Sequence, residues 1–226
     1  MYDNTILKYH IKLKNMLFNK AMINLENSIQ SINILEFNIP LDFINSIGLP
    51  NYIEENCENN VAYTLKQYVN DIYYFNKNTK VIKEIDFNEC LSSNPNIIIC
   101  LFTLSSPEFH LSDLDCLLKY IRTNKAILLG SFYDETDIDA MKTKNNECFK
   151  IKDGKLLFSY NTIRGMKISN EISLFNKEFI MGKSKEHGIN VEFFKYKDID
   201  TRHEKFLTDD FKNSLELRTC FICKGF

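Results

Sequence analysis

The feature that most constrains this chain is the uncharged run IIICLFTL at residues 97–104. Eight consecutive residues without a charge are typical of a strand that other elements cover on both faces. Such a strand belongs to a mostly parallel sheet, because parallel strands are joined by helical crossovers that pack on the two sides. The run therefore predicts an α/β domain.

Further strand candidates lie on both sides of this run, at residues 32–38, 51–55, 79–87, 126–132, 154–160, 189–194 and 215–223. The last two are separated by about twenty residues, and the second of them closes the chain. This spacing predicts an antiparallel hairpin at the edge of the sheet.

Apolar residues at helical spacing predict helices between the strands. One helix is expected near residues 61–72, where Val61 and Leu65 begin an apolar face. A second is expected to begin at Ser112, with Asp115 as its capping partner. A third is expected to run from about residue 172 to Gly188, since glycine commonly ends a helix.

The N-terminal residues 5–30 have the pattern of a basic amphipathic helix or helix pair, with Lys8, Lys12, Lys14 and Lys20. Such a face either contacts RNA phosphates or an acidic partner, or is simply a solvated helix surface. The predicted organisation is a helical segment at 1–30 followed by one domain at 31–226.

The composition is that of a globular protein and not of a basic nucleic-acid-binding domain. Hydrophobic residues make up 44% and charged residues 26% of the 226 residues, as in globular proteins. A formal net charge of −2 is unlike that of a free-standing nucleic-acid-binding domain, which is usually basic. With no apolar run near the roughly 18 residues of a membrane span and no signal sequence, we expect a cytoplasmic protein without membrane contact.

Few motifs in the sequence carry chemistry. The chain contains no P-loop signature, which excludes a P-loop NTPase, and no G-x-S-x-G or H-E-x-x-H. Cys220 and Cys223 form a C-x-x-C inside an apolar run, which we interpret as two strand cysteines. His110 follows the strongest strand, but a loop histidine is more often solvated than catalytic. We therefore expect no catalytic residue and no metal site.

Three segments carry a resemblance to a known family: NIIICLFTLSSPEF (96–109), AILLGSFYDETDIDAMK (126–142) and NEISLFNKEFIMGKSKEHGINVEFF (170–194). In this order the chain resembles the class I S-adenosylmethionine-dependent methyltransferases. Within that superfamily it is most similar to the mRNA cap guanine-N7 methyltransferases, in particular the poxvirus-type module. The resemblance implies a Rossmann-like fold: a mostly parallel seven-stranded sheet, a C-terminal antiparallel hairpin, and helices on both faces.

The resemblance also implies site residues. The places that bind the cofactor in the family are occupied here by Lys14, Glu36, Asp42, Asn56 and Asp86. The places that bind the cap substrate are occupied by Ser105, Ser106 and Glu171, with Glu171 introducing a helix.

Several of these places depart from the family. Asn38 and Pro40 replace glycines of the loop after the first strand, where the backbone must approach a ligand closely. Asn56 replaces the acid that accepts both ribose hydroxyls. Leu101, with Ser105 and Ser106, replaces a glutamine and a His-Tyr pair that contacts guanine.

Three hypotheses follow. The first is a catalytically inactive methyltransferase-like subunit that holds no cofactor and stimulates a cap guanine-N7 methyltransferase as a heterodimer, with at most weak or indirect RNA contact. Poxvirus-type small subunits set the precedent, and viral or cytoplasmic-plasmid capping systems would suit it. The second is an active, divergent methyltransferase that binds S-adenosylmethionine and acts on an RNA cap or a small molecule. The third is a Rossmann-like domain unrelated to methylation, which a structure with some other strand order would establish.

Overall fold

The structure is a computed structural model. It describes residues 13, 16, 17, 20, 21, 33–36, 59–63, 79–82, 91–92, 94–101, 104, 109–137, 139, 149–152, 155–161, 167–195 and 218–226. For residues 33–36, 59–63 and 79–82 the description is confined to the backbone.

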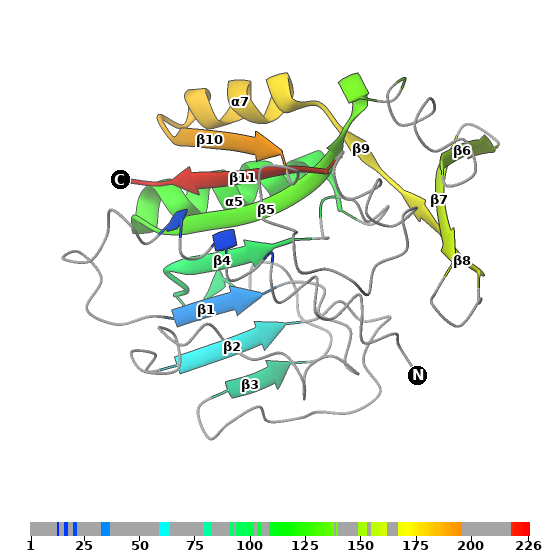
Figure 1. Cartoon of the computed structure of the whole chain (residues 1–226). Coiled ribbons are helices and arrows are strands. Elements are labelled where there is room, and N and C mark those ends of the chain that lie inside the picture. Colours follow the sequence, from blue (N-terminus) through cyan, green and yellow to red (C-terminus); the bar gives the residue numbers. More distant parts are fainter. Residues whose placement is uncertain are drawn as a thin grey trace.

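The main sheet has eight strands, seven of which follow the order β10-β11-β5-β4-β1-β2-β3 (Figure 1). Their bounds are β1 Asn33–Glu36, β2 Asn59–Tyr63, β3 Thr79–Ile82, β4 Ile97–Cys100, β5 Ile127–Asp134, β10 Asn190–Lys195 and β11 Arg218–Lys224. The eighth strand, β9 (Leu174–Phe175), pairs with the end of β5. Within the run β5-β4-β1-β2-β3, every pair of neighbouring strands is parallel, as the uncharged run at 97–104 predicts.

The C-terminal hairpin is confirmed, with one detail that the sequence does not give. β11 is antiparallel to β10, but it is also antiparallel to β5 and lies between the two. The last strand of the chain is therefore inside the sheet. β10, which precedes it in sequence, is the edge strand.

The strand that pairs with β1 and β3 is not among those expected from the sequence. The expected strand at 51–55 lies outside the described residues, while residues 59–63 form β2 and pair with β1 and β3. The helix expected at 61–72 is therefore wrong at its start, and its remainder lies outside the described residues. A run as short as NNVAY is compatible with both the helical and the strand repeat of apolar residues. It forms a strand because it pairs with a strand on each side.

A second, antiparallel sheet stands beyond the carboxyl ends of the main strands (Figure 1). It has the order β6-β7-β8, with β6 at Phe149–Lys152, β7 at Lys155–Asn161 and β8 at Lys167–Ile172. The strand predicted at 154–160 corresponds to β7 but belongs to this small sheet. Its two partners were not predicted.

Helix α5 (Leu111–Asn124) returns from β4 to β5 and buries Leu114, Leu117, Leu118 and Ile121. The predicted capping pair of Ser112 and Asp115 is wrong. The backbone N–H of His110, the N-cap, donates to Asp113 Oδ2 at 2.9 Å. The N-cap is thus two residues earlier than predicted, and Asp115 is free to contact another element.

Helix α7 (Lys177–Glu186) begins later than the predicted residue 172. Ile172 lies in β8 and Phe175 in β9, and the side chain of Asn176 caps the helix by accepting from the N–H of Glu178 at 2.8 Å. The predicted end is confirmed, since Gly188 follows the last turn with a φ of 65°. Among the residues described, no helix combines the length and apolarity that crossing a membrane requires.

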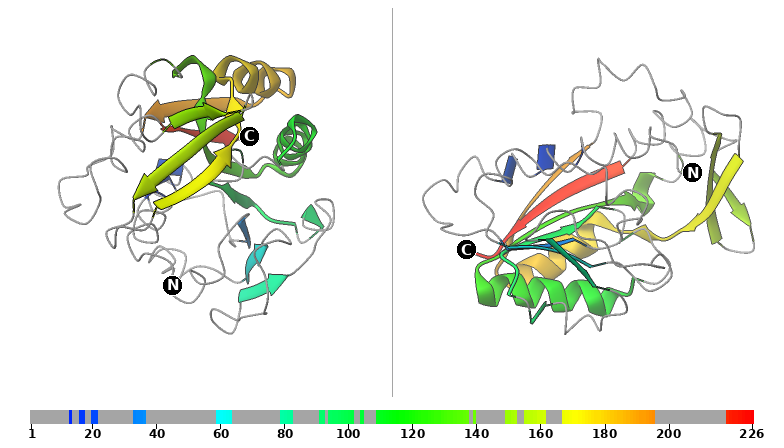
Figure 2. Two further views of the ribbon diagram at one scale, coloured as in Figure 1. Left: turned by 90° about the vertical axis from the view of Figure 1, so that its right-hand side faces the viewer. Right: turned by 90° about the horizontal axis from the view of Figure 1, so that it is seen from below.

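Helical elements cover both faces of the sheet (Figure 2). α5 and α7 lie on one face, over a cluster that includes Phe132 and Phe221. Helical residues near the N-terminus lie on the other face, where Leu13 and Leu17 are fully buried. They fall within the predicted segment 1–30, and the division at residue 30 stays a prediction.

Gly130 shows why β5 and β11 can pack as they do. It is paired with Phe221 across the two strands, and a Cβ atom at position 130 would overlap the Phe221 ring. The aromatic ring therefore lies over a residue without a side chain. Any larger residue at 130 must displace the ring.

Candidate ligand site at the carboxyl edge of the sheet

The strand order reverses at β1, which has β4 on one side and β2 on the other. In open α/β sheets, ligands bind beyond the carboxyl ends of the strands at this switch point. Glu36 is the last residue of β1 and is paired with Ile99 of β4. The predicted residue Glu36 therefore lies where such a site would be.

Most of the other predicted site residues cannot be located. Lys14, Asp42, Asn56, Asp86, Ser105 and Ser106 lie outside the described residues. The loop positions Asn38 and Pro40 lie outside them as well. Their roles stay predictions.

Glu171 is placed differently from what the resemblance implies. It is in β8 of the small sheet, opposite Leu157 of β7, and does not introduce a helix. The helix begins six residues later, at Lys177. Glu171 and Glu36 thus belong to separate sheets, because β8 pairs with β7 before the chain returns to the main sheet at β9.

Leu101 follows β4 at the place where the family has a ligand-contacting glutamine. Its side chain is buried, with 1% exposed. A buried aliphatic side chain offers no hydrogen bond to a ligand. At this place the described residues hold no replacement for the polar group.

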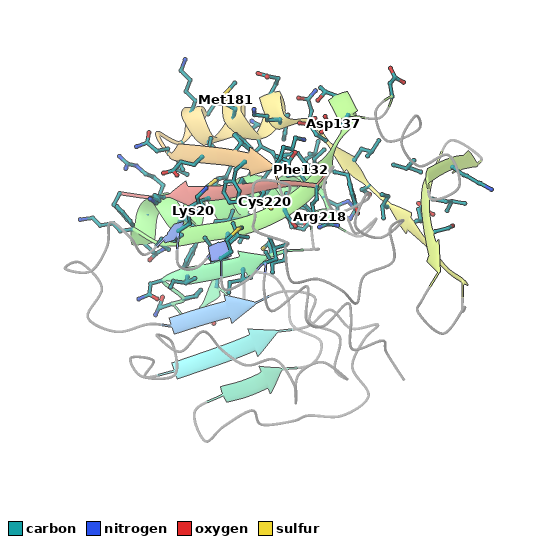
Figure 3. The ribbon with its side chains drawn as sticks, viewed as in Figure 1. Lys20, Phe132, Asp137, Met181, Arg218 and Cys220 are labelled. Atoms are coloured by element: carbon teal, nitrogen blue, oxygen red, sulfur yellow. The ribbon has the colours of Figure 1, made fainter. Side chains whose placement is uncertain are left out.

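A buried arginine organises this edge of the sheet, and sequence reasoning missed it. Nη1 of Arg218 donates to the carbonyl oxygen of Leu101 at 2.8 Å and to Ser131 Oγ at 2.8 Å. The Ser131 hydroxyl also donates to the Leu101 carbonyl oxygen. The guanidinium lies 4.5 Å from the centre of the Tyr133 ring (Figure 3). The available signal was an arginine directly before the uncharged run at residues 219–223.

The carboxyl end of β5 carries three acidic residues, each with a contact inside the chain. Asp134 is buried, and its Oδ1 accepts from the backbone N–H of Thr136 at 3.2 Å. Glu135 accepts from the side chain of Asn176, and Asp137 forms an ion pair with Lys195. These contacts tie β5 to the start of α7 and to β10. They are typical of a structural role.

The C-x-x-C pair is two strand cysteines, as interpreted. Cys220 is paired with Ser131 and Cys223 with Leu128, which lie on opposite faces of the sheet because neighbouring residues alternate. Burial raises the pKa of each thiol to about 12. The two sulfur atoms cannot form a reactive pair.

Two further expectations concern histidine and metal. His110 is an exposed N-cap residue, in agreement with a solvated histidine. Among the residues that the structure describes, no three His, Cys, Asp or Glu side chains are grouped to hold a metal ion. The expected lack of a metal site stays a prediction for the whole chain.

Solved structures with the same arrangement identify the fold. An S-adenosylmethionine-dependent methyltransferase from Clostridium acetobutylicum has a TM-score of 0.54 at 12% identity, covering 95% of this chain and 91% of its own. DesVI from Streptomyces venezuelae has a TM-score of 0.54 at 8% identity, with all of both chains covered. The chain has the class I methyltransferase fold.

A putative S-adenosylmethionine-dependent methyltransferase from Listeria monocytogenes agrees, with a TM-score of 0.51 at 9% identity and 94% and 98% coverage. No protein-family model and no curated protein sequence matches the chain. The main sheet does not have the other strand order that would have established the third hypothesis. At these identities the fold is shared, while activity must be argued from the site.

Proposed function

We propose that this chain is a catalytically inactive subunit with the class I methyltransferase fold, which binds and stimulates a cap guanine-N7 methyltransferase. The supporting observation combines the position of the end of β1 in the structure with the sequence that follows it. β1 ends at Glu36 on the switch point, and residues 37–42, which follow it in the sequence, contain no glycine. A cofactor that lies against this loop needs a backbone without side chains.

The neighbouring part of the edge supports the same proposal. The position after β4 is a buried leucine, and the polar groups beside it are bonded to Arg218. Methyl transfer to a ring nitrogen depends on positioning two substrates against each other. A chain that holds neither one tightly can retain the fold and serve a catalytic partner.

The chain would stimulate its partner by changing how often the partner adopts its active conformation. A subunit that binds the competent conformation of its partner more tightly raises the fraction of that conformation. The proposed partner is the catalytic methyltransferase subunit of a capping enzyme, in a heterodimer. RNA contact by this chain is weak or indirect in this scheme.

The second candidate function is an active, divergent methyltransferase. It is favoured by the complete strand order and by an acidic residue, Glu36, at the end of β1. S-adenosylmethionine would then lie over β1 with Lys14, Asp42, Asn56 and Asp86 in the cofactor site. Ser105, Ser106 and Glu171 would be the candidates for substrate contact, on an RNA cap or a small molecule.

Calorimetric titration of the purified chain with S-adenosylmethionine and S-adenosylhomocysteine separates the two. The proposed function predicts no binding by a folded, monodisperse sample. Micromolar affinity, about 8 kcal/mol of binding free energy, favours the active enzyme. In that case Asp86→Ala should abolish binding.

The stimulatory role needs its own assay. The chain is added to a catalytic cap methyltransferase subunit from the same source, with capped RNA and methyl donor present. The expected result is a rise in methylation rate that saturates with added chain. Methylation of GpppRNA by this chain alone, at a rate typical of enzymes, would overturn the proposal.

A further inference from the structure

One side of helix α7 forms a stripe that no described residue covers. Glu178, Met181, Gly182 and Lys185 are spaced at i, i+3, i+4 and i+7, so they lie along one side of the helix. All four are exposed, and Met181 has 43% of its surface accessible (Figure 3). The opposite side of α7 buries Ile180 and Ser184 toward the sheet.

Within the part of the chain that the structure describes, no contact requires glycine at position 182. Glycine in a helix interior is less favourable than alanine. A Cβ atom at position 182 would meet nothing within 4 Å, and of the described glycines only Gly188 has a positive φ. What glycine does offer at this position is a shallow surface on which another backbone or a large side chain can approach closely.

The stripe is self-complementary. Its centre lies between Met181 and Gly182, and Glu178 and Lys185 lie three residues to either side. In an antiparallel pair of such helices, Met181 packs on the second copy's Gly182, and Glu178 faces the second copy's Lys185. Two-fold symmetry requires this kind of complementarity, in which one patch matches itself.

The charges at the two ends of the stripe are available for such contacts. Neither Glu178 nor Lys185 forms an ion pair with another described residue. Lys183, on the flank of the helix, is already paired with Glu186 at 2.7 Å and lies 4.0 Å from Asp115. The stripe thus keeps one acidic and one basic side chain for a partner of opposite pattern.

We propose that this stripe is the contact surface of a homodimer, in which a second copy of this chain packs its α7 antiparallel to the first. The occupant is a second copy because the charge order and the Met-Gly step both repeat under a two-fold axis. A contact built around one helix from each subunit is small, so the dimer is weak and depends on concentration. The proposal is independent of whether the chain methylates.

The test is sedimentation equilibrium of the full chain over a concentration series. Glu178→Lys and Lys185→Glu each place like charges opposite each other twice, and we expect each to weaken the dimer at least fivefold. The double variant restores opposite charges and should recover the affinity. Lys150→Glu, an exposed change in β6 of the small sheet, is the matched control and should leave the dimer unchanged.

Gly182→Ala separates the interface from helix stability. Alanine should raise the melting temperature of the chain and yet weaken the dimer about tenfold, because the added methyl group holds the helices apart. If Gly182 were required by the fold of the chain itself, alanine would lower both the melting temperature and the affinity of the dimer. A monomer at every concentration up to the order of a millimolar overturns the proposal. A double charge reversal that behaves like the single ones overturns it as well, and the stripe would then belong to a different protein.

Discussion

Arg218 at the start of β11 donates to the carbonyl oxygen of Leu101, which lies 117 residues earlier in the chain. This bond joins β11 to the turn after β4, across the intervening strand β5. Ser131 of β5 is bonded to both groups, so all three strands meet at one point. The carboxyl edge of β4 is therefore fixed by the C-terminal part of the chain.

Replacing Arg218 by methionine should destabilise the protein. The methionine fills part of the volume but leaves the Leu101 carbonyl and the Ser131 hydroxyl without their charged donor. Loss of two hydrogen bonds to a charged group lowers the free energy of unfolding by about 2–4 kcal/mol. Urea unfolding followed by circular dichroism measures it.

Lys224→Met, at the other end of β11, is the control. Its ion pair with Glu192 is long, at 3.4 Å, and Glu192 is 60% exposed, so the change should be below about 1 kcal/mol. If both substitutions changed the free energy of unfolding equally, the hydrogen bonds of the buried arginine would not contribute more than an exposed ion pair.

Two glycines should respond to alanine in opposite directions. Gly130→Ala forces the Phe221 ring to move in a fully buried layer and should lower the free energy of unfolding by about 1–3 kcal/mol. Gly182→Ala, on an open helix surface, should raise it by about 1 kcal/mol. Thermal unfolding of both variants and the wild type measures these changes. A loss of stability in Gly182→Ala would contradict the finding that a Cβ atom at position 182 meets open space.

The strands that could be predicted from the sequence are those that lie in long uncharged runs. Residues 97–104 and 126–132 carry long uncharged runs, and β4 and β5 lie there, fully buried. β2 could not be predicted, because Asn59–Tyr63 has one strongly apolar position and becomes a strand through pairing with β1 and β3. The early start predicted for α7 has a related cause, since Ile172 and Phe175 fit helical spacing but belong to two short strands.

The site was predictable only in part. Glu36 could be placed at the switch point because the end of a first strand fixes that position in this fold. The Arg218 cluster could not be predicted, since its members are brought together from positions 101, 131 and 218 by the strand order β4-β5-β11. Glu171 was wrongly expected to introduce a helix, because it lies in the small sheet before the helix begins. Its substrate contact stays a prediction.

The contact between α5 and α7 should depend on pH. His187 Nε2 lies 3.0 Å from Asp115 Oδ1, and the bond with this histidine lowers the pKa of Asp115 below its usual value of 3.8. A carboxyl group with a lowered folded-state pKa adds stability above its unfolded pKa, and the contribution is lost as pH falls through the folded value. Asp115→Asn should therefore reduce stability by less than about 1 kcal/mol near neutral pH, because the pair is half exposed.

Urea unfolding at several pH values between 2 and 6 measures this dependence. The difference between wild type and Asp115→Asn should shrink as pH falls below about 4. Asp113→Ala, at the N-terminus of the same helix, loses the acceptor of a capping bond instead and serves as a comparison. A difference for Asp115 that stayed constant over this range would show that its pKa is not lowered by the contact.

The described cysteines should differ sharply in reactivity. Cys116 is exposed on α5, whereas Cys220 and Cys223 are buried with thiol pKa values raised to about 12. Because the thiolate is the reacting form, N-ethylmaleimide should modify Cys116 in the native protein and reach the other two only after unfolding in urea. Peptide mass spectrometry after timed labelling distinguishes them. Labelling of Cys220 or Cys223 at the rate of Cys116, or a disulfide between them, would show that β11 is not held between β5 and β10 as described.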